Sequence, residues 1–263
     1  MEVGGVVTLL STTPIKGLRM RHPATVMLDR SGAAGDRDFM LVDDQRKLVS
    51  ITTLGALVRI GAEWDPARRQ LDLLNTDGER ICSGTVELAE GVIVDCYGFE
   101  TKAARYAPGP WDALFEQVVG RRLRLVKTDH PGGGSDVGPV TLMGEGSLRA
   151  LERESGLGPI DPRRFRMLIQ FATEHEHVED GWEGLTLDAG GARLRVGKAV
   201  PRCAAITRHP EEGQRDLPIV SAIRAYRGIQ QTGFGSGVPF GVYADVIESG
   251  LVSVGDGLRI VRP

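Results

Sequence analysis

The chain is organised around one stretch, Val200-Pro201-Arg202-Cys203-Ala204-Ala205-Ile206-Thr207-Arg208-His209-Pro210, where an apolar strand is expected to end at an arginine and a lone cysteine. A cysteine thiolate is a soft metal ligand and is also the nucleophile of sulfur transfer. Either role needs a nearby cation, and Arg202 and Arg208 lie close to Cys203 in the sequence. The alternative is a structural role, because most free cysteines are buried and inert.

The composition bounds the class of protein. The chain has 263 residues, 41% of them hydrophobic, which fits one large or two ordinary domains with a proper core. The net charge of -3 comes from 32 basic and 35 acidic residues that are well mixed along the sequence. Without a charge block, we expect neither a nucleic-acid partner nor a membrane partner.

The cysteines and the amino terminus indicate a cellular location. Cys82, Cys96 and Cys203 form no C-x-x-C pair and no zinc-like array, which predicts a reducing compartment. The apolar run Val6–Leu10 is short and follows no basic residue, so we expect neither a signal peptide nor a membrane span. These features together predict a soluble, cytoplasmic protein.

The first hundred residues are predicted to be mostly strands. Apolar and β-branched runs alternate with turn-forming clusters such as Ser31–Asp36 and Asp77-Gly78. Many short strands separated by turns are typical of an antiparallel barrel or sandwich. The expected strands are residues 24–28, 39–42, 47–51, 69–74 and 92–97.

A change in composition at Ala107-Pro108-Gly109-Pro110 marks a predicted domain boundary, with one domain over residues 1–105 and another over 106–263. Apolar residues at helical spacing then predict a helix from Trp111 to Gly120, and residues 122–127 are expected to form a strand. The glycine-rich run Pro131–Ser135 lacks the lysine and hydroxyl order of a phosphate-binding P-loop. We expect it to be a mobile surface loop.

The second half is predicted to alternate strands with two short helices. Residues 145–155 are expected to be helical, with Gly144 at the N-cap and Gly156 at the end. Pro218 is expected to open the second helix, which ends at Gly228. The expected strands are residues 140–143, 164–169, 192–196, 241–247, 251–254 and 258–261, and the last three are expected to close a barrel.

Several short motifs resemble, in order and spacing, those of a known family. They are Pro14-Ile15-Lys16 ("YPVKS"), Gly35-Asp36-Arg37-Asp38-Phe39-Met40-Leu41-Val42 ("GDRRWMLVD"), Arg164-Phe165-Arg166 ("RFRPN"), Glu179-Asp180-Gly181-Trp182 ("EDSW"), Arg202-Cys203 with Thr207 ("SRC…T") and Gly255-Asp256 ("GD"). Each fragment alone is a weak signal. Together they resemble the MOSC family, named for the C-terminal domain of molybdenum cofactor sulfurase, and in particular its two-domain branch that includes the amidoxime-reducing components.

The resemblance implies a mainly β (α+β) fold, with an N-terminal β-barrel domain over residues 1–105 and a MOSC β-barrel domain with a few short helices over residues 106–263. It implies a molybdenum cofactor (Mo-molybdopterin) between the domains, with Cys203 as the molybdenum ligand and as a catalytic residue. Asp180 is the second catalytic candidate, as a proton source or as the residue that orients a donor. A phosphate needs charge-assisted donors, preferably bidentate ones. The residues implied to bind the cofactor are Lys16, Arg37, Arg164, Arg166, Arg202 and Thr207.

The chain departs from the family pattern at positions where polar groups are usual. Gly17, Gly144 and Pro201 replace serines, and Met167-Leu168 replaces Pro-Asn. Each lost hydrogen bond is worth about 1 kcal/mol. These changes weaken the expected cofactor site unless backbone amides compensate.

The function that the resemblance implies is reduction of small N-oxygenated (N-hydroxylated) substrates by a molybdenum-dependent oxidoreductase. The sequence has neither a cysteine cluster for an iron–sulfur centre nor a dinucleotide fingerprint, so a separate electron-donor protein is expected, either a flavoprotein or an iron–sulfur or haem carrier. Two alternatives stay open. One is a sulfur carrier with a Cys203 persulfide, and the other is a non-catalytic carrier of the cofactor.

Overall fold

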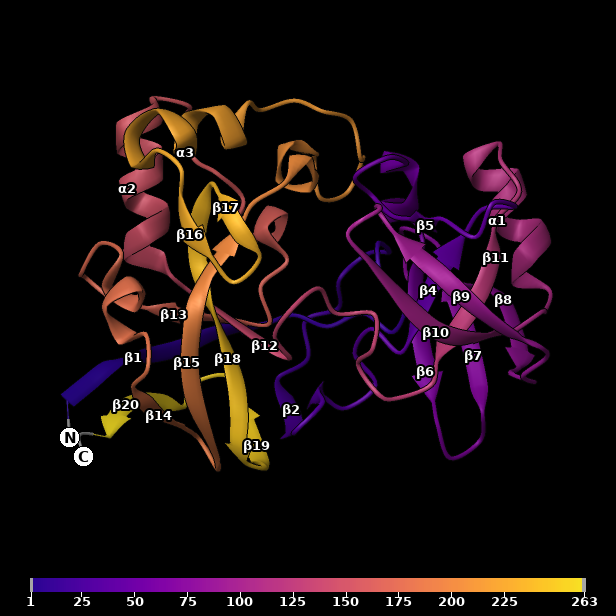
Figure 1. The fold of residues 1–263 in the computed structure, drawn as a ribbon, viewed down its shortest axis with the longest axis horizontal. Helices are drawn as coiled ribbons and strands as arrows, with labels where there is room; N and C mark the ends of the chain where they lie inside the picture. The colour runs from indigo at the N-terminus through magenta and orange to yellow at the C-terminus, as the bar shows by residue number, and fades with distance from the viewer. Residues whose placement is uncertain (1, 262–263) are drawn as a thin grey trace.

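A closed seven-stranded barrel forms one body of the protein, in a computed structural model that describes residues 2–261 (Figure 1). Neighbouring strands are antiparallel except β12 and β13, which are parallel. Alternate side chains of these strands point inward and fill the barrel with an apolar core. In order around the barrel, the strands are β1 (Glu2–Leu10), β13 (Ile169–Ala172), β12 (Val140–Gly144), β18 (Pro239–Glu248), β15 (Ala192–Pro201), β14 (Thr186–Ala189) and β20 (Gly257–Val261).

A second body, on the right of Figure 1, contains two further sheets around a core of its own. Helix α1 (Trp111–Val119) and the short helix η1 (Gly55–Arg59) cover that core. The five-stranded sheet has the order β5 (Leu48–Val49), β4 (Phe39–Val42), β11 (Arg124–Thr128), β10 (Glu100–Tyr106) and β9 (Gly91–Cys96). The three-stranded sheet contains β6 (Gly61–Asp65), β7 (Gln70–Leu74) and β8 (Arg80–Thr85).

The chain starts in the barrel, passes through the second body and then returns. After β1, strands β2 (Thr25–Asp29) and β3 (Gly32–Ala33) pack on the barrel core, and β2 pairs both with β3 and with β19 (Gly250–Ser253) near the other end of the chain. The chain then forms β4 to β11 in the second body before it re-enters the barrel at β12. The segment between β1 and β2 also reaches the second body, because Ile15 and Leu18 belong to its core, so the chain passes between the bodies several times.

The mainly β fold with few helices is confirmed. The predicted domain boundary at residue 106 stays a prediction. The strand pairings show that each body contains residues from both sides of this position. Strand β1 pairs with β13 and β20 in the barrel, although it comes from the start of the chain. Strand β11 and helix α1 lie beyond residue 106, but they pack with the sheet and core of the second body.

The ends of the three α-helices lie where the sequence predicts them. Helix α1 ends at Gly120, whose left-handed backbone (φ 67°) suits a residue without a side chain. Helix α2 (Glu145–Ser155) begins after Gly144 and ends at Gly156 (φ 64°). Helix α3 (Ile219–Arg227) runs from Pro218 to Gly228. None of the helices in residues 2–261 has the length and hydropathy needed to cross a bilayer.

The strand predicted over residues 164–169 is wrong except at Ile169, the first residue of β13. Pro162–Phe165 forms the short helix η2, and Asp161 caps its start, because the side chain of Asp161 accepts a hydrogen bond from the backbone N–H of Arg163 at 2.9 Å. Arg166 then adopts a left-handed backbone, and β13 begins only at Ile169. The alternation of polar and apolar residues therefore reflects a capped turn, not a pleated strand.

Two other predictions also need correction. The loop 131–135 is not a mobile surface segment, because Gly133 and Gly134 are buried and their carbonyl groups accept hydrogen bonds from Lys102 and Lys16 at 2.9 and 2.7 Å. Strand β19 does not help to close the barrel, since it pairs with β2 outside it. Strands β18 and β20 do belong to the barrel.

The core of the second body should depend strongly on Trp111. Its ring is fully buried, and its indole N–H donates to the carbonyl oxygen of Ala107 at 2.8 Å. We expect Trp111→Ala to lower the free energy of unfolding by about 3–5 kcal/mol, measured by urea denaturation. Ile93→Ala, at a mostly exposed position, is the control and should change it by less than about 0.5 kcal/mol. Similar losses in the two variants would contradict this assignment of the core.

Candidate functional site

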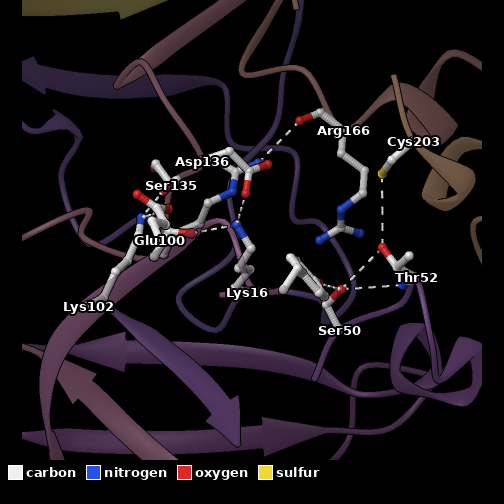
Figure 2. Close-up of polar contacts among 12 residues, drawn as sticks. Lys16, Ser50, Thr52, Glu100, Lys102, Ser135, Asp136, Arg166 and Cys203 are labelled. Atoms are coloured by element: carbon white, nitrogen blue, oxygen red, sulfur yellow. Dashed lines mark hydrogen bonds and ion pairs between the residues drawn. The ribbon is translucent and has the colours of Figure 1, made fainter. Parts of the chain in front are cut away.

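Cys203 faces a cleft between the two bodies (Figure 2). Strand β15 ends at Pro201, and Cys203 is the extended residue (φ −115°, ψ 179°) just before the short helix η4 (Ala204–Thr207). The side chain is exposed, and its Sγ lies 3.9 Å from Oγ1 of Thr52, a residue of the second body. The thiol is therefore accessible and faces across the gap between the bodies.

The second body contributes hydroxyl groups that the sequence analysis missed. Ser50, Thr52 and Tyr97 line the cleft, and the hydroxyl of Ser50 contacts those of both other residues. Burial raises the pKa of Tyr97, so its hydroxyl keeps its proton at neutral pH. A sequence signal did exist, since three of the four residues in Ser50–Thr53 carry hydroxyls directly after strand β5.

The barrel contributes two arginines, Arg166 and Arg202, that form no ion pair with a carboxylate within residues 2–261. Figure 2 shows the side chain of Arg166 reaching into the space between Lys16 and Cys203. Its Nη2 donates to the carbonyl oxygen of Leu18 at 2.7 Å. Burial, together with the nearby charge of Arg37, lowers the pKa of Arg166 to about 9. The guanidinium is still charged at neutral pH but is poorly solvated, which favours binding of an anion.

Arg202 is held beside Cys203 by groups without net charge. Its Nη2 donates to the carbonyl oxygen of Phe165 at 2.6 Å, and its Nη1 lies 3.3 Å from Sδ of Met167. Its Nε is buried and has no hydrogen-bond partner among the described residues. Burial lowers the pKa of this guanidinium too. A buried donor without an acceptor is uncommon in native proteins, and this one belongs to a residue that lines the cleft.

Lys16 and Arg37 also line the cleft, but each already has an acidic partner. Lys16 forms an ion pair with Asp136, and Arg37 forms one with the buried carboxylate of Asp36. Four cations near the thiol therefore face two carboxylates.

Arg37 and Arg166 also have left-handed backbones (φ 52° and 54°), a conformation that costs about 1–2 kcal/mol and tends to occur at functional sites.

Three predicted site residues do not line the cleft. Arg164 is buried in a bidentate ion pair with Asp216, with distances of 2.7 and 2.6 Å. The hydroxyl of Thr207 donates to the carbonyl oxygen of Ala204 at 2.7 Å, within η4. Asp180 pairs with Arg227 of α3, away from Cys203.

The glycines at the family's serine positions have structural explanations. Gly17 has φ +93°, and a Cβ there would lie 2.9 Å from Cα of Ser50, so no side chain fits. Gly144 does not line the cleft, and a Cβ there would lie 3.0 Å from Oε2 of Glu179. The cleft hydroxyls come from Ser50 and Thr52 instead.

The side chains of the cleft suit a metal whose other ligands belong to a bound cofactor. Within residues 2–261, no group of three or more His, Cys, Asp or Glu side chains is arranged to hold a metal ion. Cys203 supplies one soft donor, and Arg166 and Arg202 supply charge for an anionic chelator. The cleft has a volume of about 150 Å³, so a pterin-sized group would also occupy its open mouth. By the chemistry of these donors, the residues fit a molybdenum cofactor.

Comparison with known proteins gives one family match. The family model described as "MOSC domain" matches residues 129–259. No curated protein matches the sequence. Among solved structures, the YUAD protein from Bacillus subtilis is 11% identical over 97% of this chain and 93% of its own, with a TM-score of 0.43. YiiM from Geobacillus stearothermophilus is 17% identical over 48% and 55% of the two chains (TM-score 0.35), and YiiM from Escherichia coli is 14% identical over 51% and 59% (TM-score 0.35).

The buried carboxyl group of Glu179 should make the free energy of unfolding depend on pH. Its carboxyl is fully buried, and Oε1 accepts hydrogen bonds from the backbone N–H of Gly144 at 3.2 Å and from the hydroxyl of Ser147 at 2.6 Å. Oε2 has no partner among the described residues. Burial raises the pKa of Glu179, so the folded protein holds the proton more tightly than the unfolded chain. Its contribution to stability is therefore present below about pH 4.5 and is lost as pH rises through the raised pKa.

We expect Glu179→Gln, which mimics the protonated acid, to gain stability relative to wild type as pH rises from about 5 to about 8. Urea denaturation across this range measures the difference in free energy of unfolding. Glu116→Gln, at an exposed position of α1, is the control and should show a constant difference. A constant difference for Glu179→Gln as well would mean that Glu179 is ionised in the folded protein.

Proposed function

This chain is a MOSC-domain protein, and on that basis we propose that its Cys203 cleft binds a molybdenum cofactor and reduces small N-oxygenated substrates. MOSC domains are associated with this cofactor. The observation that supports the proposal is the exposed thiol of Cys203, which faces arginines of the barrel and hydroxyls of the second body across one cleft.

Each group in the cleft has a distinct task in this proposal. The thiolate of Cys203 holds the metal, for which sulfur is a suitable ligand. Arg166 and Arg202 bind the anionic part of the cofactor. When bound, the cofactor would supply the two-electron redox chemistry. Tyr97 places its hydroxyl, which contacts that of Ser50, in the wall of the cleft.

The proposed reaction consumes electrons and protons, and each needs a source. Reduction of an N-hydroxylated substrate breaks the N–O bond, consumes two electrons and two protons, and releases water. The protons come from solvent, because Cys203 lies in an exposed cleft. The electrons come from a separate donor protein, a flavoprotein or an iron–sulfur or haem carrier.

A sulfur carrier is the second candidate, since the same exposed thiol suits a persulfide. Cys203 is the exposed cysteine, whereas Cys82 is partly buried and Cys96 is buried. Burial raises the thiol pKa of both Cys82 and Cys96, which makes them poor nucleophiles. A non-catalytic cofactor carrier is the third candidate, and the replacement of polar family residues by Gly17, Gly144, Pro201 and Met167-Leu168 supports it.

Cys203→Ala should remove bound molybdenum from protein purified from a cofactor-producing host. We expect stoichiometric metal in the wild type by mass spectrometry, near-complete loss in Cys203→Ala, and retention in the matched control Cys82→Ala. Amidoxime reduction with an artificial electron donor should follow the metal content. A metal-loaded protein without this activity would favour the carrier. A persulfide on Cys203 without metal would favour sulfur transfer and refute the proposal.

Asp136 should weaken cofactor binding, because its carboxylate neutralises Lys16 in the cleft. We expect Asp136→Asn to tighten binding by about two- to fivefold, a modest gain because the Asp136 side chain is largely exposed. Loss of molybdenum during dialysis measures the change. Glu100→Gln, which removes a charge from the nearby Lys102 pair, is the control and should leave retention unchanged. Faster loss from Asp136→Asn would show that Asp136 supports the site.

A further inference from the structure

A second cavity, of about 330 Å³, lies beside the Cys203 cleft. The two share Ile51, Arg166 and Ala205 in their walls. The second cavity extends away from the thiol, between the segment that follows β1, helix η1, helix η2 and the segment that follows η4. Cys203 does not line it. It is also larger than the cleft, and its volume falls in the range of small-molecule sites.

Arg19 brings a positive charge to this cavity without an ion-pair partner in the described part of the chain. Its guanidinium donates only to backbone carbonyl oxygens, those of Val58, Arg59, Asn75 and Thr76, at 3.0 to 3.1 Å. Carbonyl oxygens satisfy its N–H groups but leave its charge in place. Partial burial lowers its pKa, while the carboxylates of Glu211 and Asp77 raise it from a distance.

Arg208, which lines the cavity from the barrel side, is also held by backbone carbonyl oxygens. Its Nη1 donates to the carbonyl oxygen of Gly213 at 2.8 Å, and its Nη2 donates to those of Thr52 and Thr53 at 3.1 and 3.3 Å. Its Nε is buried and has no hydrogen-bond partner within residues 2–261. Burial and the charge of Arg215 lower its pKa. Backbone carbonyl oxygens therefore hold Arg208, and no ion pair within residues 2–261 neutralises its charge.

The acidic groups at this cavity are already paired. Glu211, the one carboxylate in its described wall, lies 2.8 Å from Arg163, which also pairs with Asp161. Arg164 is bound by Asp216. Three further arginines of the wall, at positions 19, 166 and 208, have no carboxylate within ion-pair distance among the described residues. The cavity therefore has an excess of positive charge.

Such an excess is costly between two packed bodies, because partly desolvated charges repel unless a counter-charge is present. Arginine forks match the oxygens of phosphate in charge and geometry. The hydroxyl-bearing Thr76 and the imidazole of His22 add polar side chains to the same wall. We propose that this cavity is a second anion site beside the Cys203 cleft, centred on Arg19 and Arg208, which do not line that cleft, and that it takes the phosphate group of a small molecule. The inference does not depend on molybdenum chemistry.

Inorganic phosphate is the probe, titrated by calorimetry into full-length protein from a host that lacks the cofactor, at constant ionic strength set with chloride. We expect saturable binding of phosphate that Arg208→Gln weakens by about tenfold, a typical effect of losing one charge-assisted contact. Arg208→Lys keeps the charge and should restore most of the binding. Lys16→Gln removes a cation of the Cys203 cleft and should leave phosphate binding unchanged.

Two further measurements are needed: a control variant at a surface arginine, and the effect of phosphate on thermal stability. Arg153→Gln, which removes an exposed arginine of α2, should leave phosphate binding unchanged. If Arg208→Gln does not fold, Arg208→Lys together with the rise in wild-type melting temperature on adding phosphate takes its place. Absence of saturable binding by wild type would overturn the proposal, as would equal weakening by Lys16→Gln.

Cofactor-loaded protein distinguishes the two possible sources of the phosphate group. Retained binding of inorganic phosphate after loading supports a site separate from the cofactor, available to a phosphorylated substrate. Loss of phosphate binding on loading would mean that the cofactor's own phosphate fills this cavity, which contradicts a separate site. A protein that binds phosphate but never molybdenum would refute the proposed function and leave this inference intact.

Discussion

The structure depends on the pairing of β1 with β13 and β20, which closes the barrel with a strand from the start of the chain. Because β1 is fixed between two strands from the second half, the segment that follows it is fixed as well. That segment carries Lys16 and Arg19 along the boundary between the bodies, opposite Arg166. A change in the register of β1 by one residue would reverse its inward and outward faces and move this segment away from Arg166.

Charge at the boundary between the bodies follows from that arrangement. Several guanidinium groups there are held by backbone carbonyl oxygens, as seen for Arg166, Arg202 and Arg208. This geometry fixes the position of each guanidinium and leaves its charge unbalanced. Carboxylate partners would stabilise the empty protein, but they would also compete with an anionic ligand. The arrangement is therefore better suited to binding than to stability.

The cleft around Cys203 also shows that the polar groups of a site can come from positions that a motif does not predict. The glycine at position 17 allows a close approach of the chain to Ser50, where a serine side chain would clash. Ser50 and Thr52 then supply hydroxyls from a neighbouring segment. At the barrel end of α2, Glu179 occupies the space beside Gly144 that a serine would need. Substitution at a motif position is thus compensated by neighbours.

The sequence by itself determined the features that depend on neighbouring residues. Prolines and glycines set the ends of the helices, as at Gly156 and Gly228, and short runs of apolar residues set most of the strands. The order of the motifs identified the family and made Cys203 a candidate site residue. These signals are local, because backbone conformation and capping are decided within a few residues.

Only the tertiary structure decided which charged groups are available to a ligand. Arg164 and Arg166 stand two residues apart in one motif, yet Asp216 pairs with the first and no carboxylate within residues 2–261 pairs with the second. The placement of Tyr97 in the cleft likewise depends on how the bodies pack. The physical reason is that an ion pair or a shared wall joins residues far apart in the chain, so its partners are chosen by packing and are not specified by local sequence.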